Sequence, residues 1–183
     1  SSLFLPSHVF GSYHRVPLLC LLRAPNYTTN TYSSAPSLHV ALPIYFEFHF
    51  YLVGQAEQMK VTFSSSNDSA DPSQLPAPEL VPQGYIMPPG TAVSGMGVHA
   101  INPTTPEFQH QPFTATLIYG YYNQQQTFIE PMVSLEFLLS KPSFSASVPR
   151  PAAYTKPGAY PSTYAINFDA ANNVYEVSLK DIR

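Results

Sequence analysis

The segment 113–122 constrains the fold of this chain more than any other. Its sequence, FTATLIYGYY, contains no proline and no charged residue. Its aromatic and β-branched side chains favour a pleated, half-buried strand. The polar residues 123–126 then provide a turn, and residues 127–130 have the composition of a returning strand. Strand, turn and strand together predict a β-hairpin.

Composition extends this preference to the rest of the chain. The 183 residues include 20 prolines, 13 tyrosines and 12 phenylalanines, whereas charged residues make up only 10%. Proline interrupts helices, and aromatic side chains fit a pleated surface. A chain of this length is expected to form one domain. We therefore expect a mainly β fold, a small barrel or sandwich, with one or two short helices.

Alternating side chains predict another strand at residues 46–53. Phenylalanines at every second position alternate there with Glu47 and His49, which is the period of a half-buried strand. Glu47 and His49 then share the face opposite the phenylalanines. Short strands are also expected at 144–148, 164–168 and 174–179. Short helices are expected at 55–60 and at 132–140, the latter preceded by Pro131 as its first helical position.

The first 44 residues differ in composition from the remainder. They contain none of the 11 acidic residues but include the only cysteine. Residues 37–44, SLHVALPI, resemble a translated sequencing adapter that reads SLHDALPI. We therefore predict that residues 1–44 are an assembly artefact or a poorly ordered extension, and that residues 45–183 form a single domain. This interpretation assigns no function to His8, His14, Cys20 and His39.

Charge and motifs exclude several functional classes. The formal net charge is −3 and the basic residues are scattered, whereas nucleic-acid-binding proteins cluster lysine and arginine. No apolar stretch approaches the length that spans a bilayer. The chain has neither a phosphate-binding glycine loop of the Walker type nor a Gly-x-Ser-x-Gly nucleophile motif. We therefore expect no nucleic-acid partner and no transmembrane segment.

Two of the remaining histidines are candidates for a site. His99 follows a glycine-rich turn, and Glu130 ends the returning strand of the hairpin. If these strands share one sheet, Glu47, His49, His99 and Glu130 converge. Imidazole and carboxylate groups are competent ligands for zinc, iron(II) or manganese, so one candidate cofactor is a divalent metal. The alternative is a hydrogen-bonded polar network without metal. His110 lies in a polar stretch and is expected to be solvated.

Tyrosines near the hairpin and near the end of the chain form the other notable group. Tyrosine is enriched where one side of a surface is apolar and the other is wet, as at protein interfaces. A surface for self-association and ordinary strand packing both explain these residues. They are Tyr119, Tyr121, Tyr122, Tyr154, Tyr160 and Tyr164.

Several motifs, in this order, resemble a bacterial family of unknown function, the Thermus TTHB-like domain. They are residues 46–51 (FEFHFY), 95–99 (GMGVH), 113–120 (FTATLIYG), 128–132 (FIEPM) and 158–164 (GAYPSTY). The resemblance implies a β-rich domain that forms homo-oligomers and belongs to exported or envelope-associated bacterial proteins. It implies no activity.

The chain departs from the pattern of that family at three places. Tyr45 stands where the family has a histidine, Ala100 where it has a tryptophan, and residues 123–125 where it has Asp-Gly. An adapter ending in T would convert a histidine codon, CAT, into the tyrosine codon TAT. We therefore predict that Tyr45 replaces a histidine that would have strengthened the metal site.

These observations favour an exported, extracytoplasmic, oligomeric domain that binds a metal or a small-molecule ligand. The first alternative is a metal-dependent enzyme that uses the same four histidine and glutamate residues. The second is a purely structural envelope protein, which requires no site.

Overall fold

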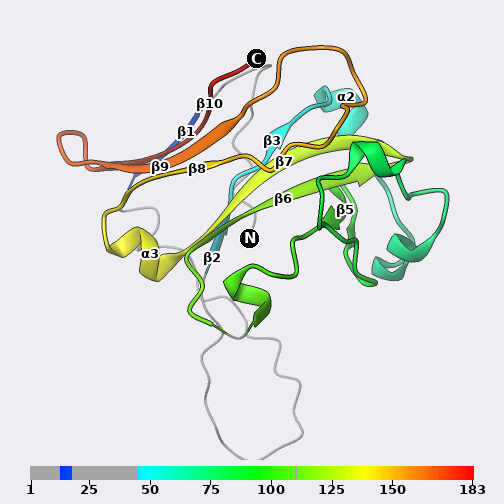
Figure 1. Cartoon of the computed structure of the whole chain (residues 1–183), viewed down its shortest axis with the longest axis horizontal. Coiled ribbons are helices and arrows are strands. Elements are labelled where there is room, and N and C mark those ends of the chain that lie inside the picture. The colour runs from blue at the N-terminus through cyan, green and yellow to red at the C-terminus, as the bar shows by residue number, and fades with distance from the viewer. Residues whose placement is uncertain (1–12, 18–44, 110) are drawn as a thin grey trace, which may run out of the picture.

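Two antiparallel sheets form the domain (Figure 1). The computed structural model describes residues 13–17, 45–109 and 111–183. Within them, the first sheet has the spatial order β1 (Tyr13–Pro17), β10 (Val174–Lys180), β9 (Thr163–Asp169) and β8 (Ser143–Ser147). The second has the order β2 (Tyr45–Glu47), β7 (Gln125–Ser134), β6 (Ala115–Tyr122), β5 (Gly97–Ala100) and β4 (Ala92–Val93), with β3 (Phe50–Tyr51) also paired to β7.

The helices are short, and the prediction of a mainly β fold with one or two of them is confirmed. The two α-helices in the described part are α2 (Gln55–Gln58) and α3 (Leu135–Leu139). Three 3-10 helices lie in the loops: η1 (Ser66–Ala70), η2 (Pro78–Leu80) and η3 (Pro106–Gln109). None of the described helices has the length and hydropathy needed to cross a bilayer.

The main core lies between the two sheets. Its buried side chains include Phe46, Tyr119 and Ile129 from the second sheet and Ile166 and Tyr175 from the first. Packing of apolar side chains from both sheets into one cluster is typical of a sandwich. Burial of this apolar surface supplies the main driving force for joining the two sheets.

Strand packing accounts for three of the six tyrosines that the sequence analysis grouped as a candidate surface for self-association. Tyr119, Tyr121 and Tyr164 are buried in the main core, with at most 5% of their surface exposed. The hydroxyl of Tyr119 donates to the carbonyl of Pro149 at 3.0 Å, and that of Tyr121 donates to the carbonyl of Leu80 at 2.7 Å. These bonds satisfy the polar ends of rings that are otherwise buried.

A smaller apolar cluster covers the opposite face of the second sheet. Its buried members are Phe113, Ile118, Phe128 and Met132, and the side chains of Tyr51, Met96 and Ile101 pack against it. We call this side of the sheet the outer face. The second sheet is therefore apolar on both faces, which explains why β6 and β7 are buried along almost their whole length.

The single strand predicted at 46–53 is divided into β2 and β3. The N–H of Phe48 donates to the carbonyl of Pro131 at 3.1 Å. Proline has no N–H with which to return this bond, so the ladder with β7 lacks one hydrogen bond at this point. The two parts still alternate as predicted, because Phe46, Phe48 and Phe50 are all buried in the main core.

The prediction of a helix across 131–140 is wrong in its first half. Pro131 lies within β7, opposite Leu117 of β6, and the strand continues to Ser134. The helix begins only at Leu135, where the side chain of Ser134 accepts a hydrogen bond from the N–H of Phe137 at 3.1 Å. Pairing with β6 and with β2 on either side keeps residues 131–134 extended.

The predicted hairpin is confirmed, with a tighter turn than residues 123–126. Strand β6 ends at Tyr122 and β7 begins at Gln125, so Asn123 and Gln124 form the turn. Both have positive φ, 47° and 66°. Two-residue hairpin turns of this kind match the twist of the strands that they connect.

Most of the segment 1–44 lies outside the described residues, as does His110. The exception is β1, which pairs with the edge of β10 in an antiparallel register. The interpretation of residues 1–44 as an artefact or an extension stays a prediction. His8, Cys20 and His39, to which that interpretation assigns no function, lie outside the described residues.

Candidate metal centre

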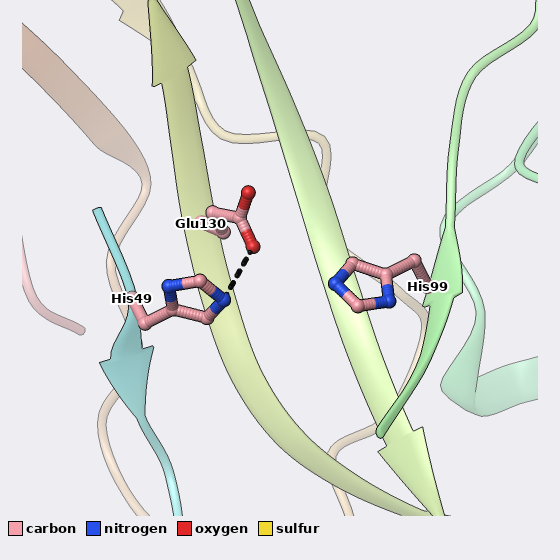
Figure 2. A group of neighbouring side chains, drawn as sticks. All are labelled: His49, His99 and Glu130. Carbon is pink, nitrogen blue, oxygen red and sulfur yellow. Dashed lines mark ion pairs between the residues drawn. The ribbon is translucent and has the colours of Figure 1, made fainter. Parts of the chain in front are cut away.

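His49 and Glu130 meet across the junction between β2 and β7. Phe50 pairs with Ile129 and Glu47 pairs with Met132, which places His49 beside Glu130 on the outer face. The Nε2 atom of His49 lies 2.9 Å from Oε2 of Glu130 (Figure 2). The Glu130 side chain is fully buried, and only 9% of the His49 side chain is exposed. The contact is therefore an ion pair shielded from water whenever His49 is protonated.

His99 approaches from β5, which lies beyond β6 on the side of β7 away from His49. It lies on β5 opposite Gly120 of β6, and its ring points toward His49 and Glu130 (Figure 2). Its Nδ1 atom lies 2.9 Å from the carbonyl oxygen of Thr91. A carbonyl only accepts hydrogen bonds, so Nδ1 carries the proton and the neutral ring keeps its lone pair on Nε2. Metal-binding histidines are commonly oriented in this way by a backbone carbonyl.

The three side chains form a group that could hold a metal ion. One ligand atom from each of His49, His99 and Glu130 lies within 4.8 Å of the others. Zinc bonds of 2.0–2.2 Å in a tetrahedral arrangement separate neighbouring ligand atoms by about 3.4 Å. The His49–Glu130 pair is already closer than this, at 2.9 Å. The three ligand atoms, which lie within 4.8 Å of one another, would have to approach by about 1 Å to bind one ion.

Glu130 is the group that most requires a cation. None of its surface is exposed. Apart from the ion pair with His49, neither carboxylate oxygen has a hydrogen-bond partner among the described residues. A buried carboxylate is costly unless charges or donors compensate it. A metal ion at this point would supply that compensation.

Electrostatic shifts show how closely the acidic groups interact with His49. Burial lowers the pKa of His49, but the hydrogen bond and the charge of Glu130, with a further contribution from Glu47, leave it above its usual value. Burial and the charge of Glu130 raise the pKa of Glu47, and His49 opposes this rise. Proximity of like charges favours the neutral acid, and proximity of opposite charges favours the imidazolium.

Glu47 is close to the site but outside the three-residue group. It lies on β2, opposite Met132 and two residues before His49, so it shares the outer face. The structure thus brings together His49, His99 and Glu130 and leaves Glu47 as a neighbouring acid. Tyr45 shares this face by the period of the strand, and the charges of Glu47 and Glu130 both raise its pKa after the larger effect of burial.

Two aromatic residues that sequence reasoning missed enclose the site. The ring of Tyr51 stacks on His49, with centroids 5.7 Å apart and planes at 15°. Phe128 meets His49 edge-on at 4.7 Å and His99 at 5.3 Å. The sequence did contain a signal, because Tyr51 is two positions from His49 and Phe128 is two positions from Glu130. Residues so spaced on a strand share a face.

The hydroxyl of Tyr51 connects the two halves of the site. It donates to the carbonyl of Gly95 at 3.0 Å, and the side-chain amide of Gln58 donates to the same oxygen at 3.2 Å. Gly95 belongs to the turn that leads into β5 and His99. Burial raises the pKa of Tyr51 to about 12, although a hydrogen bond with the Gln58 side chain lowers it in part. The hydroxyl therefore remains a donor at neutral pH. We call this arrangement the Tyr51–Gly95 link.

Replacing Tyr51 with phenylalanine is expected to lower the free energy of unfolding by about 0.5–1.5 kcal/mol. The ring and its stacking on His49 remain, and only the bond to Gly95 is lost. Urea denaturation measures the change. Tyr160→Phe is the matched control, because its hydroxyl donates to the carbonyl of Lys156 in an exposed position. Equal losses in the two variants would contradict a role for the link.

Comparisons of the chain with protein families, with curated proteins and with solved structures gave no match. The resemblance to the TTHB-like domain stays a prediction from sequence motifs. The candidate site therefore depends on its geometry alone.

Proposed function

We propose that this domain binds a divalent transition-metal ion through His49, His99 and Glu130. The observation that carries the proposal is the fully buried carboxylate of Glu130, which has two imidazoles beside it and no hydrogen-bond donor among the described residues other than the paired His49. Two histidines and one carboxylate form a recurrent ligand set for such ions.

The donor types indicate the class of ion. Imidazole nitrogens suit zinc and iron(II), and the carboxylate also suits manganese. Calcium and magnesium prefer oxygen ligands, so they should bind weakly here. Three protein ligands leave at least one position of the ion for water or a small molecule, as in sites that exchange ligands. The ligand-binding role predicted from the sequence fits this open position.

A metal-dependent enzyme is the second candidate, and Glu47 favours it. The pKa of this neighbouring carboxyl is raised, which brings it closer to the range of a proton-transferring group. A metal ion beside it would lower the pKa of a bound water. Glu47 would then accept or return the proton of that water.

Metal titration of the purified full chain tests the proposal. We expect one equivalent of zinc or cobalt(II) to bind by calorimetry, with much weaker binding of magnesium. His99→Ala should reduce zinc affinity by at least about 100-fold. This variant leaves the His49–Glu130 ion pair in place, so it separates a metal site from a simple buried pair.

His110→Ala is the control, because this histidine lies in a polar stretch of the sequence and is not one of the proposed ligands. Wild-type protein that binds neither zinc nor cobalt(II) would refute the proposal. The purely structural alternative would then account for the His49–Glu130 pair. The exported location and the homo-oligomer implied by the family resemblance stay separate proposals that this titration does not address.

A further inference from the structure

The ring of Phe128 contacts both imidazoles of the proposed site. Phe128 is completely buried. Its ring meets His49 at 66° and His99 at 62°, with centroid distances of 4.7 and 5.3 Å. The same ring contacts Tyr51 at 5.8 Å. Any displacement of this ring would change the space available to both histidines.

Gly120 provides the space in which the Phe128 ring lies. The two residues are directly opposite each other on β6 and β7, and Gly120 also pairs with His99 on β5. A Cβ atom at Gly120 would lie 2.1, 2.3 and 2.5 Å from three atoms of the ring. Because the φ of Gly120 is not in the left-handed region, this glycine serves close packing rather than an unusual backbone conformation.

A β-bulge lies directly beside this pair, whereas Phe128 faces outward because it is two positions from Glu130 on β7. Gly120 pairs with Phe128, but Tyr121 pairs with Gln126, so Thr127 is an extra residue in β7. Tyr121 belongs to the main core, whereas Phe128 belongs to the outer cluster. Bulges of this kind redirect side chains and are frequent next to functional sites.

We propose that Phe128, packed against Gly120, is a positioning residue that fixes the relative orientation of the His49 and His99 imidazoles. The expected effect of Phe128 on metal affinity rests on the proposed metal-binding function. Its effect on the orientation of the two imidazoles is independent of that function, because the ring contacts exist without metal. Hydrogen-bonded neighbours that orient metal-binding histidines typically change affinity by about 10–100-fold when they are replaced, and we expect a comparable effect from Phe128.

Phe128→Leu tests the proposal with three measurements on the full chain. Zinc affinity is expected to fall by about 10–100-fold, as for other residues that orient metal ligands. The visible absorption bands of the cobalt(II) protein should shift, because they report the geometry of the ligands. In the metal-free protein, the nuclear Overhauser contacts of the His49 ring with Tyr51 and of the His99 ring with Thr91 should weaken, beyond the shift of the imidazole resonances that loss of the Phe128 ring current causes by itself.

Phe144→Leu is the matched control. Phe144 lies on β8 and packs against Phe137 and Tyr164, with ring centroids 5.5 and 5.7 Å away. This variant also loses a packed ring but should keep the wild-type zinc affinity and cobalt spectrum. A Phe128→Leu protein with unchanged affinity and spectrum would overturn the proposal. If the wild type binds no metal, the NMR measurement decides: unchanged Overhauser contacts of either imidazole overturn the proposal, and weakened contacts at both histidines support it.

A second pair of variants tests the packing of the ring over Gly120. Gly120→Ala should lower the urea midpoint and perturb the same imidazole resonances. Adding Phe128→Leu should restore part of the midpoint, because leucine can rotate away from the new methyl group. The resonances should remain perturbed in the double variant. Gly158→Ala serves as the control, since its added Cβ would meet only Tyr160, at an ordinary 3.7 Å.

Discussion

Replacing Glu130 with glutamine is expected to abolish stabilisation by zinc while the protein stays folded. Glutamine has nearly the same shape, and its amide oxygen can accept a hydrogen bond from His49 in place of the ion pair. At a zinc concentration 100 times the dissociation constant, wild-type protein should gain about 2.7 kcal/mol. For a chain of this size that gain raises Tm by about 5–10 °C. The variant should show almost none of this shift.

Thermal melts with and without zinc measure the effect, and Glu136→Gln is the control. Glu136 is an exposed glutamate on α3, so its replacement should leave the zinc-induced shift unchanged. A Glu130→Gln protein that keeps the full shift would show that the ion binds elsewhere. A variant that fails to fold without zinc would instead show that the His49–Glu130 ion pair is essential to the fold itself.

Gly97→Ala is expected to destabilise the protein by at least about 3 kcal/mol, which is a large part of the 5–15 kcal/mol typical of a domain. Gly97 has a φ of 143°, and a Cβ there would lie 2.6 Å from the carbonyl oxygen of Tyr121 and 3.0 Å from its nitrogen. Backbone atoms cannot move aside as a flexible side chain can. The strands β5 and β6 would have to separate, two residues before His99.

Urea denaturation measures this loss, with Gly158→Ala as the control. Gly158 has no positive φ, and its added methyl group would make one ordinary contact. We expect the control to unfold within about 1 kcal/mol of the wild type. A Gly97→Ala protein of similar stability would mean that β5 can adjust without strain, and the close approach of β5 to β6 would then not be what places His99.

The fold class could be predicted from the sequence because strand patterns are local. Phenylalanines at alternate positions gave the buried face of β2 and β3, and the hairpin of β6 and β7 followed from two strand-like segments around a polar turn. The helix predicted from Pro131 shows the limit of local signals. Proline is favourable at a first helical position, but pairing of β7 with strands on both sides keeps this segment extended.

The candidate site shows the same division. The strand period placed Glu47 and His49 on one face, and the choice of His99 and Glu130 followed from their donor groups. The sequence could not show which of the four residues lie together, because the distance between side chains on different strands depends on strand order and register. In the structure, His49, His99 and Glu130 form one group and Glu47 lies beside it. Phe128 and Gly120 have no donor atoms that would have marked them in the sequence.

The sequence by itself indicated a mainly β fold, most of the longer strands, the buried face of β2 and β3, and which side chains can bind a metal. These properties depend on side-chain chemistry and on neighbours along the chain. Only the tertiary structure decided which strands are adjacent, where β7 bulges, and how completely Glu130 is buried. Each of these results from packing among segments far apart in sequence, whose energies no local pattern contains.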